Sequence, residues 1–359
     1  MKVRMEERGR LMRRAVDNQL DGTDVDQLMR RALQATATTL PHPNPRVGAV
    51  IVNPQGAVLS VAAHEGPGTP HAERLALEGL DDVSGHTMIV TLEPCDHHGR
   101  TPPCTDAIID AGISRVIVGT RDPDAQVRGA GIKRLRDAGI DVIESDLSPV
   151  IEANDPVYFA NRRAGTPFVT LKLAMTLDGQ IAAADATSQW ITQLPARRDA
   201  HRLRAAHDAV LVGAGTLRND DPQLTVRLDG YDGPQPRPVI LKGSSELPAM
   251  ARLSGRNPLV IQGTEASGAA IEGVLDRLGD EGIRSVLVEG GARIARSFLD
   301  SGEVDELVVY IGAKLAAGTG LPAVGGVFAT IAEAIPLEIT DVRSIGSDVR
   351  IIAHLGGRN

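Results

Sequence analysis

The stretch between residues 70 and 104 reads PHAE at residues 70–73, TLEPC at residues 91–95 and DHHGRTPPC at residues 96–104. It holds both cysteines of the chain, Cys95 and Cys104, together with His71 and Glu73. One imidazole and two thiolates suit zinc, and a site with only three protein ligands leaves the fourth tetrahedral position open to water. This stretch therefore predicts a catalytic zinc site.

Glu73 lies two residues beyond His71 and supplies a carboxylate that the ligand set does not need. Zinc with an open position lowers the pKa of a bound water from about 16 towards about 7. A nearby glutamate can then carry the proton from this water to a leaving group. A His-x-Glu pair followed by Pro-Cys and a second Cys is typical of zinc nucleobase deaminases. Here eight residues, not two, separate the cysteines.

Two structural interpretations of the same residues stay open. His97 or His98 could complete a closed structural zinc site, and Cys95 could form a disulfide with Cys104. With only two cysteines, a Cys-rich structural site is disfavoured, and nothing in the composition points to an oxidising compartment. The residues therefore favour the catalytic zinc site.

Composition restricts the kind of protein. A chain of 359 residues has room for two domains, and 42% apolar residues is usual for a globular protein. The formal charge of -8 argues against a general nucleic-acid-binding surface. No run of 18 apolar residues and no apolar leader is found, so we expect no membrane span and no secretion signal. A cytoplasmic protein without membrane or nucleic-acid partners is expected.

Strands and helices alternate along most of the chain. Residues 1–24 form a polar N-terminal extension, residues 25–150 a first α/β domain, residues 151–166 a proline-bearing linker and residues 167–359 a second α/β domain. In the first domain the strand expected at residues 87–92 ends just before Cys95. A helix expected to start at residue 105 places Cys104 at its N-terminus, where a thiolate is favoured.

Two glycine-bearing stretches stand out in the second half, VGAGT at residues 212–216 and EGGA at residues 289–292. Each follows a β-like run and precedes a helix-like run, an arrangement that can hold a phosphate with backbone N–H groups. Neither is a full G-x-G-x-x-G, because Arg218 stands at the third glycine position of the first. Residue patterns alone thus indicate a nucleotide or phosphate site and nothing more specific.

Several motifs resemble the bifunctional deaminase/reductase family of riboflavin biosynthesis, from about residue 28 almost to the end of the chain. In the first half these are HPNPRVG at residues 42–48 and the two motifs at residues 70–73 and 91–104. In the second half they are KLAMTLDG at 172–179, SQWIT at 188–192, GTLRNDDPQLTVR at 215–227 and VEGG at 288–291. The resemblance implies an α/β fold with an N-terminal cytidine-deaminase-like three-layer domain and a C-terminal dihydrofolate-reductase-like domain.

The resemblance also implies roles for individual residues. Zinc ligands would be His71, Cys95 and Cys104, with Glu73 as the proton shuttle. The pyrimidine pocket would include Asn44 and His64, with Arg100 on the phosphate. NADPH would contact Ala174, Trp190, Thr216, Asp220, Gly291, Ala292, Arg293, Ile294, Ala295, Arg296 and Ser297. The reductase substrate would contact Ser188, Arg204, Leu224, Arg227 and Glu289.

The implied function is a pair of reactions on a small pyrimidine ribonucleotide. A diaminohydroxy-pyrimidine ribosylamine phosphate would lose an amine by hydrolysis, and NADPH would then reduce its ribose to ribitol. Family members are commonly homo-oligomers, so a homo-oligomer is expected. The alternative is a nucleic-acid or free-nucleoside deaminase whose second domain binds a nucleotide without catalysis. Basic patches and stacking aromatics would be expected on a nucleic-acid-binding module, but the chain is acidic and only 2% aromatic.

Overall fold

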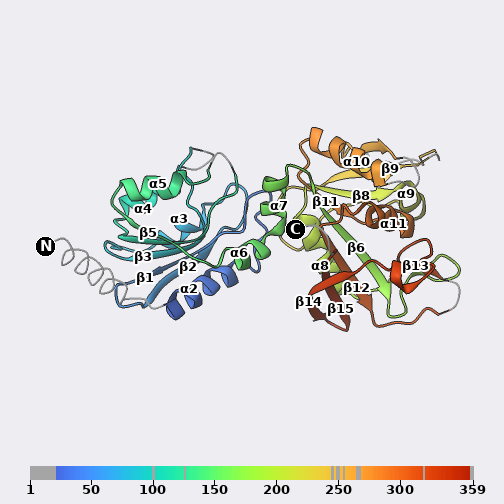
Figure 1. Cartoon of the computed structure of the whole chain (residues 1–359), viewed down its shortest axis with the longest axis horizontal. Coiled ribbons are helices and arrows are strands. Elements are labelled where there is room, and N and C mark those ends of the chain that lie inside the picture. The colour runs from blue at the N-terminus through green and yellow to red at the C-terminus, as the bar shows by residue number, and fades with distance from the viewer. Residues whose placement is uncertain are drawn as a thin grey trace. The chain divides into compact units, whose positions relative to one another are not determined.

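The computed structural model describes residues 22–98, 102–124, 127–243, 246–247, 251–253, 255–263, 268–317 and 320–355. The chain divides into two compact units, Met1–Arg163 and Ala164–Asn359 (Figure 1). Residues 1–21 of the expected N-terminal extension, and Arg100, lie outside the described residues. Within the described ranges, no helix combines the length and apolar composition that a bilayer span requires.

The first unit is built on a five-stranded sheet in the order β2-β1-β3-β4-β5. Its strands are β1 (Gly48–Val52), β2 (Val58–Ala63), β3 (Thr87–Leu92), β4 (Arg115–Thr120) and β5 (Asp141–Glu144). Strand β1 is antiparallel to both of its neighbours, β2 and β3, whereas β3, β4 and β5 run parallel to one another. In Figure 1, α3 (Ala72–Leu77), α4 (Cys104–Asp110) and α5 (Ala130–Asp137) cover one face, and α2 (Gly22–Ala35) and α6 (Ser148–Asn154) cover the other.

Helices on both faces explain why the central strands are buried and mostly apolar. All of β1 (GAVIV) is buried, as are the last five residues of β3 (TMIVTL). Such continuous apolar runs are typical of strands covered on both faces. Because the chain leaves β3 at the sheet's carboxyl edge, the segment with Cys95 emerges beside the starts of α3 and α4. The sheet thus brings the predicted zinc ligands to one edge.

Residues 151–166, predicted as a linker, are helical over most of their length. The end of α6 and most of α7 (Pro156–Ala164) occupy this segment, and residues up to Arg163 belong to the first unit. Ile151, Tyr158 and Phe159 are buried in the first core. The prolines suggested a linker, yet Pro149 and Pro156 stand in the first turns of their helices, where proline replaces an N–H that has no helical partner.

The second unit contains an eight-stranded sheet in the order β10-β9-β8-β11-β6-β12-β15-β14. Its strands are β6 (Phe168–Thr176), β8 (Ala209–Gly213), β9 (Arg237–Lys242), β10 (Leu259–Gln262), β11 (Ser285–Val288), β12 (Glu306–Gly312), β14 (Leu337–Ile345) and β15 (Asp348–Leu355). The six strands from β10 to β12 are parallel, and β15 and β14 are antiparallel additions. A separate pair joins β7 (Gln180–Ala182) to β13 (Leu321–Pro322).

Side-chain alternation along the strands separates two cores in this sheet. Leu211 of β8 packs in the cluster that contains residues of α10 (Gly268–Asp280) and α11 (Ala292–Ser301). Its neighbours Val210 and Val212 pack with Leu217 of α9 (Ala214–Asp220) and Leu203 of α8 (Leu194–Ala205). Since successive strand residues point to opposite faces, helices cover both sides of the parallel part of the sheet. This is the α/β architecture that the sequence predicts.

Candidate active sites

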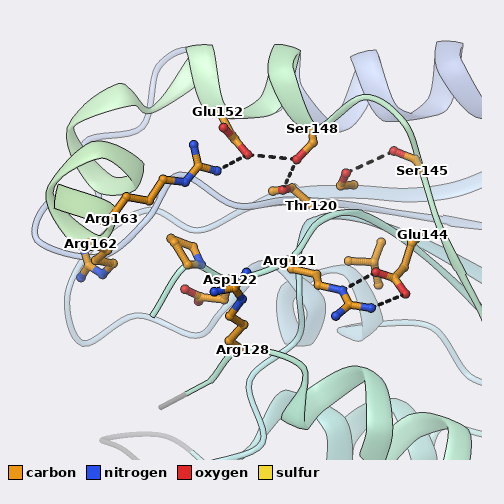
Figure 2. Close-up of a pocket in the computed structure, with 13 residues that line it drawn as sticks. Thr120, Arg121, Asp122, Arg128, Glu144, Ser145, Ser148, Glu152, Arg162 and Arg163 are labelled. Carbon is orange, nitrogen blue, oxygen red and sulfur yellow. Dashed lines mark hydrogen bonds and ion pairs between the residues drawn. The ribbon is translucent and has the colours of Figure 1, made fainter. Parts of the chain in front are cut away.

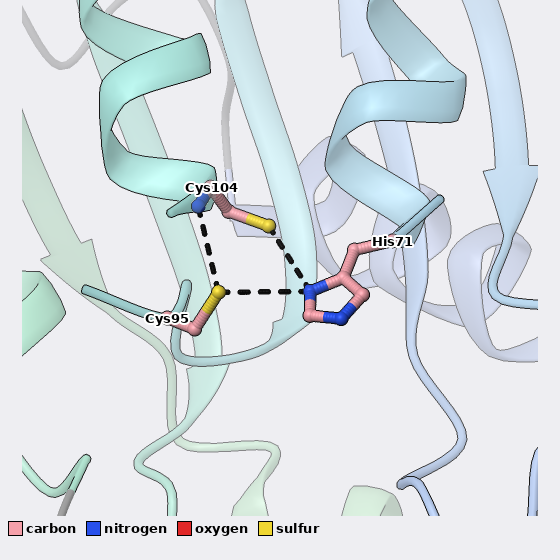
Figure 3. Close-up of side chains that lie close together, drawn as sticks. All are labelled: His71, Cys95 and Cys104. Carbon is pink, nitrogen blue, oxygen red and sulfur yellow. Dashed lines mark hydrogen bonds between the residues drawn. The ribbon is translucent and has the colours of Figure 1, made fainter. Parts of the chain in front are cut away.

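The three predicted zinc ligands converge from three separate segments. His71 caps the N-terminus of α3, Cys95 follows β3 and Cys104 is the first residue of α4. Their ligand atoms all lie within 4.8 Å of one another, and His71 Nδ1 is 3.6 Å from Cys95 Sγ and 3.3 Å from Cys104 Sγ (Figure 3). Both cysteines are free, so the structure does not contain the alternative disulfide.

Hydrogen bonds to the Cys95 sulfur favour its thiolate form. The thiol of Cys104 lowers the pKa of Cys95 by hydrogen bonding, burial opposes this, and His71 lowers it further, to about 4. The backbone N–H of Cys104, at the start of α4, also donates to Cys95 Sγ at 3.4 Å. A thiolate is the form that binds zinc. This donor set of one imidazole and two sulfurs therefore fits a zinc ion.

Glu73 lies in the first turn of α3, close to its histidine neighbour, and is only 2% exposed. Burial raises the pKa of the Glu73 carboxyl, and the nearby Cys95 raises it further. Within the described structure its Oε2 has no hydrogen-bond partner. A buried carboxylate oxygen normally has a partner, so this oxygen is free to accept a proton or a hydrogen bond from a bound molecule.

Asn44 and His64, predicted for the pyrimidine pocket, lie together beside the ligands. The His64 ring is edge-on to the His71 ring, with 5.3 Å between centroids. His64 Nδ1 lies 3.0 Å from the Pro70 carbonyl, which can only accept, so Nδ1 carries the proton. Burial lowers the pKa of His64, and the neutral ring then accepts the Asn44 Nδ2–H at Nε2 over 3.0 Å. This hydrogen bond fixes which way the Asn44 amide faces.

Glu93 is a site residue that the sequence reasoning missed. Its buried carboxylate accepts N–H groups of Gly129 at 2.9 Å, Ile132 at 3.2 Å and Asp122 at 3.4 Å. Gly129 and Ile132 belong to the first turn of α5, whose N–H groups have no partner within the helix. The sequence signal that could have identified Glu93 is its position directly after a strand of buried residues, where a carboxylate needs hydrogen-bond partners. Glu93 fixes the turn that carries Cys95.

In the second unit, Arg204 and Glu289 form a bidentate ion pair. Arg204 Nε and Nη2 lie 2.6 and 3.0 Å from the two Glu289 oxygens, and Arg204 Nη1 donates to the Thr225 carbonyl at 3.0 Å. Burial alone would raise the pKa of Glu289, but Arg204 and Lys172 outweigh it and bring this pKa to about 2. Glu289 is therefore an anion, and both of its oxygens bind Arg204.

Further basic groups surround this pair. Arg227 is exposed, and its Nη1 donates to Thr225 Oγ1 at 3.0 Å. Its backbone N–H donates to His201 Nδ1 at 3.2 Å. Burial, followed by the charges of Arg204 and Arg227, lowers the pKa of His201 to about 4. Leu224, three residues before Arg227 in the sequence, is buried and has a backbone φ of 51°. This cluster has an excess of positive charge at neutral pH, as a phosphate site requires.

The two glycine-bearing stretches of the second unit meet in space. They lie at the carboxyl ends of the neighbouring parallel strands β8 and β11, and each contains the glycine that caps a helix, Gly213 before α9 and Gly291 before α11. A Cβ on Gly213 would lie 3.1 Å from the Ile294 side chain, and one on Gly290 would lie 2.3 Å from it. Two helix N-termini at one sheet edge form a suitable phosphate cradle.

The remaining predicted reductase residues are distributed around these elements. Thr216 and Asp220 lie on α9, residues 292–297 on α11 and Ala174 on β6. Trp190 is 59% exposed, with the Arg197 guanidinium 4.1 Å from the centroid of its ring. In the described part of the chain, neither Ser188 nor Trp190 forms a hydrogen bond with the Arg204–Glu289 pair. Arg100, predicted for the first unit, lies outside the described residues.

The folds and sites together define a two-domain enzyme that joins a zinc-dependent deaminase to a reductase. Residues 23–120 match the cytidine and deoxycytidylate deaminase zinc-binding region, and residues 167–351 match the RibD C-terminal domain. Relatives named riboflavin biosynthesis protein RibD match over nearly their whole length. The Aquifex aeolicus relative is 38% identical, covering 86% of this chain and 92% of its own. The Mycobacterium tuberculosis relative is 36% identical, covering 90% and 96%.

Solved structures agree with this assignment. A RibD structure from Acinetobacter baumannii has a TM-score of 0.80 and 30% identity, and covers 93% of this chain and 99% of its own. A Thermotoga maritima deaminase/reductase has a TM-score of 0.75 and 35% identity, with the same coverage. The chain belongs to the RibD family, the bifunctional deaminase/reductases of riboflavin biosynthesis. The predicted family and the predicted fold class are confirmed.

Glu73→Gln tests the proton-shuttle role. The amide keeps the size of the side chain but cannot take up a proton, so we expect ammonia release to fall by about 10²- to 10⁴-fold. Zinc content should stay at the wild-type value because the ligands are unchanged. Zinc is measured by atomic absorption and ammonia by a coupled assay. Wild-type rates of ammonia release in the variant would disprove the role.

Proposed function

We propose that each unit of the chain carries one of the family's two reactions at the sites described above. The first unit would hydrolyse an amine from a diaminohydroxy-pyrimidine ribosylamine phosphate, and the second would reduce the ribose of the product to ribitol. The observation that carries this proposal is the convergence of His71, Cys95 and Cys104 beside the unpartnered carboxylate oxygen of Glu73. The basic cluster around Arg204 supports the second reaction.

In the deaminase site, three residues would hold zinc and three would handle the substrate. When bound by His71, Cys95 and Cys104, zinc supplies a Lewis acid that acidifies water. Glu73 takes a proton from water and delivers it to the leaving amine, so that water and the amine become a carbonyl and ammonia. Since neutral His64 accepts from the Asn44 Nδ2–H, the Asn44 carbonyl remains free to accept an N–H of the pyrimidine. That arrangement orients the ring.

In the reductase site, NADPH would supply the hydride when bound. The protein's own residues would bind and orient the cofactor and the substrate. The cofactor-binding residues are proposed to be Ala174, Trp190, Thr216, Asp220 and the segment of residues 291–297. Arg204 and Arg227 would bind the ribosyl phosphate, because guanidinium groups match phosphate geometry. Glu289 holds Arg204, and Ser188 and Leu224 complete the substrate site. The hydride would be added to the ribose carbon that carries the amine; the bond from this carbon to the ring oxygen would break, and the oxygen would take up a proton as the hydroxyl of the open chain.

A homo-oligomer is part of this proposal. The strand β14 lies at an edge of the eight-stranded sheet, and its Leu337, Ile339 and Val342 are about half exposed. Exposed apolar edge strands are unfavourable in an isolated protein unless another surface covers them. A second copy of the chain would cover this edge. We further propose that the protein acts in the cytoplasm on a small-molecule substrate. It would need neither nucleic acid nor lipid.

The proposed function is tested by following NADPH absorbance and released ammonia together, without lipid or nucleic acid. The substrate is the diaminopyrimidinone ribosyl phosphate, and a matched sample is treated with a zinc chelator. We expect both signals from the zinc-loaded chain and neither after chelation, because deamination supplies the reductase substrate. Ammonia without NADPH consumption would contradict the proposed reductase and favour a non-catalytic second domain.

Arg227→Gln in the same assay separates the two sites. Arg227 is exposed and holds no buried carboxylate, so its loss should not disturb the fold. Removing one phosphate contact should raise the reductase KM by about tenfold while ammonia release stays unchanged. An equal loss of both activities would disprove independent sites.

Oligomeric state is tested by light scattering. The wild-type mass should be a multiple of the 37.9 kDa chain. The double variant Ile339→Lys/Val342→Lys should shift this mass towards the single chain, because two buried charges would oppose association. A wild-type protein that scatters as a single chain would contradict the proposal.

A further inference from the structure

A hollow of about 600 Å³ in the first unit is not explained by either reaction. It lies at the ends of β4 and β5, between the loop after β4 and the helices α6 and α7 (Figure 2). Its volume is in the range of small-molecule sites. None of its thirteen lining residues is a proposed zinc ligand, the proton shuttle or a proposed pyrimidine contact. We refer to it as the arginine hollow.

Four arginines and three carboxylates line the arginine hollow, which gives it a formal charge of +1 in a chain of -8. Two of these arginines, Arg121 and Arg163, form ion pairs with carboxylates of the hollow. Arg121 binds both Glu144 oxygens, at 2.5 and 3.0 Å. Arg163 binds Glu152 at 2.5 Å, and Glu152 in turn accepts from Ser148 at 3.0 Å. Figure 2 shows these as two separate ion-paired groups. Their charges are neutralised within the protein.

The other two arginines, Arg128 and Arg162, still have free donors. Arg162 is mostly buried and forms a long ion pair with Asp124 at 3.6 Å, but its Nε–H has no hydrogen-bond partner among the described residues. Arg128 is exposed and forms no ion pair or hydrogen bond within the described ranges. A buried guanidinium N–H without a partner is costly, since the desolvation of its charge is not repaid. The buried Arg162 Nε–H and the exposed guanidinium of Arg128, which has no partner among the described residues, face the same hollow and together indicate an anionic ligand.

Packing holds Arg162 in place before any ligand arrives. Its guanidinium lies 3.6 Å from the centroid of the Tyr158 ring, and Nη1 donates to the Tyr158 carbonyl at 3.3 Å. The Tyr158 hydroxyl donates to the Asp122 carboxylate, with its oxygens at 2.9 and 3.0 Å. Asp122 therefore has its own partners and does not neutralise Arg162 directly. The free donor is pre-organised, which lowers the entropy lost on binding.

We propose that the arginine hollow is a second ligand site, which binds the phosphomonoester of a small molecule through Arg128 and Arg162. A phosphomonoester carries a charge of about -1.5 to -2 at neutral pH, and its oxygens can accept from both the Arg128 guanidinium and the Arg162 Nε–H. The hydroxyls of Thr120 and Ser148, which hydrogen bond to each other, lie on the wall and suit a neutral polar part such as a sugar. This site goes beyond the two proposed reactions.

Isothermal titration calorimetry on the full, zinc-loaded chain tests the site, with inorganic phosphate and ribose 5-phosphate as probes and ribose as the unphosphorylated control. We expect Arg128→Gln/Arg162→Gln to weaken phosphate binding at least tenfold. Arg128→Gln alone, at an exposed position, should weaken it without any risk to the fold. The matched control Lys133→Gln/Arg134→Gln removes two exposed charges from α5 and should stay within twofold of wild type.

Ammonia release by the same variants separates this site from the deaminase site. The deaminase KM of Arg128→Gln/Arg162→Gln should stay within twofold of wild type. A parallel rise in this KM would make the arginine hollow part of the deaminase substrate site and overturn the proposal. Unchanged phosphate binding in that variant, or no binding by the wild type at millimolar phosphate, would also overturn it. Wild-type ammonia release, which tests the proposed function itself, is unaffected by either result.

Discussion

The buried carboxylate of Glu93 fixes the part of the chain on which the deaminase site depends. It accepts three backbone N–H groups and so joins the end of β3 to the start of α5. Close packing strengthens this junction, because a Cβ on Gly131 would lie 1.9 Å from the Pro94 carbonyl oxygen. Cys95 is the next residue after Pro94, so its sulfur is placed before any metal binds. Charge-assisted hydrogen bonds in a buried setting are strong enough for this role.

Both units place their chemistry at the same position in the fold. In the first, the zinc ligands gather beyond the carboxyl end of β3; in the second, the glycine stretches gather beyond β8 and β11. Ligand sites of open α/β sheets usually lie at the carboxyl ends of the strands. The Arg204–Glu289 pair is anchored by Glu289, the residue directly after β11. One architectural rule thus accounts for the position of both candidate sites.

Sequence reasoning succeeded where a signal was local. The grouping of His71, Cys95 and Cys104 could be predicted because one short window contains all three, and the strand at residues 87–92 because its run of buried residues has clear ends. It failed where tertiary packing decides. The last two strands, β14 and β15, were not predicted, and β14 is exposed along most of its length, so no buried face produced an alternating pattern. The bonding of Glu93 and the neutral state of His201 depend on distant groups.

Zinc coordination in the purified full-length chain is the most direct test of this account. Metal analysis combined with X-ray absorption at the zinc edge should find one zinc per chain, with two sulfur ligands and one imidazole ligand. The same analysis of Cys95→Ser should show loss of one sulfur ligand or of the zinc. A wild-type protein without zinc, or a Cys95→Ser variant that keeps zinc with two sulfur ligands, would contradict the account.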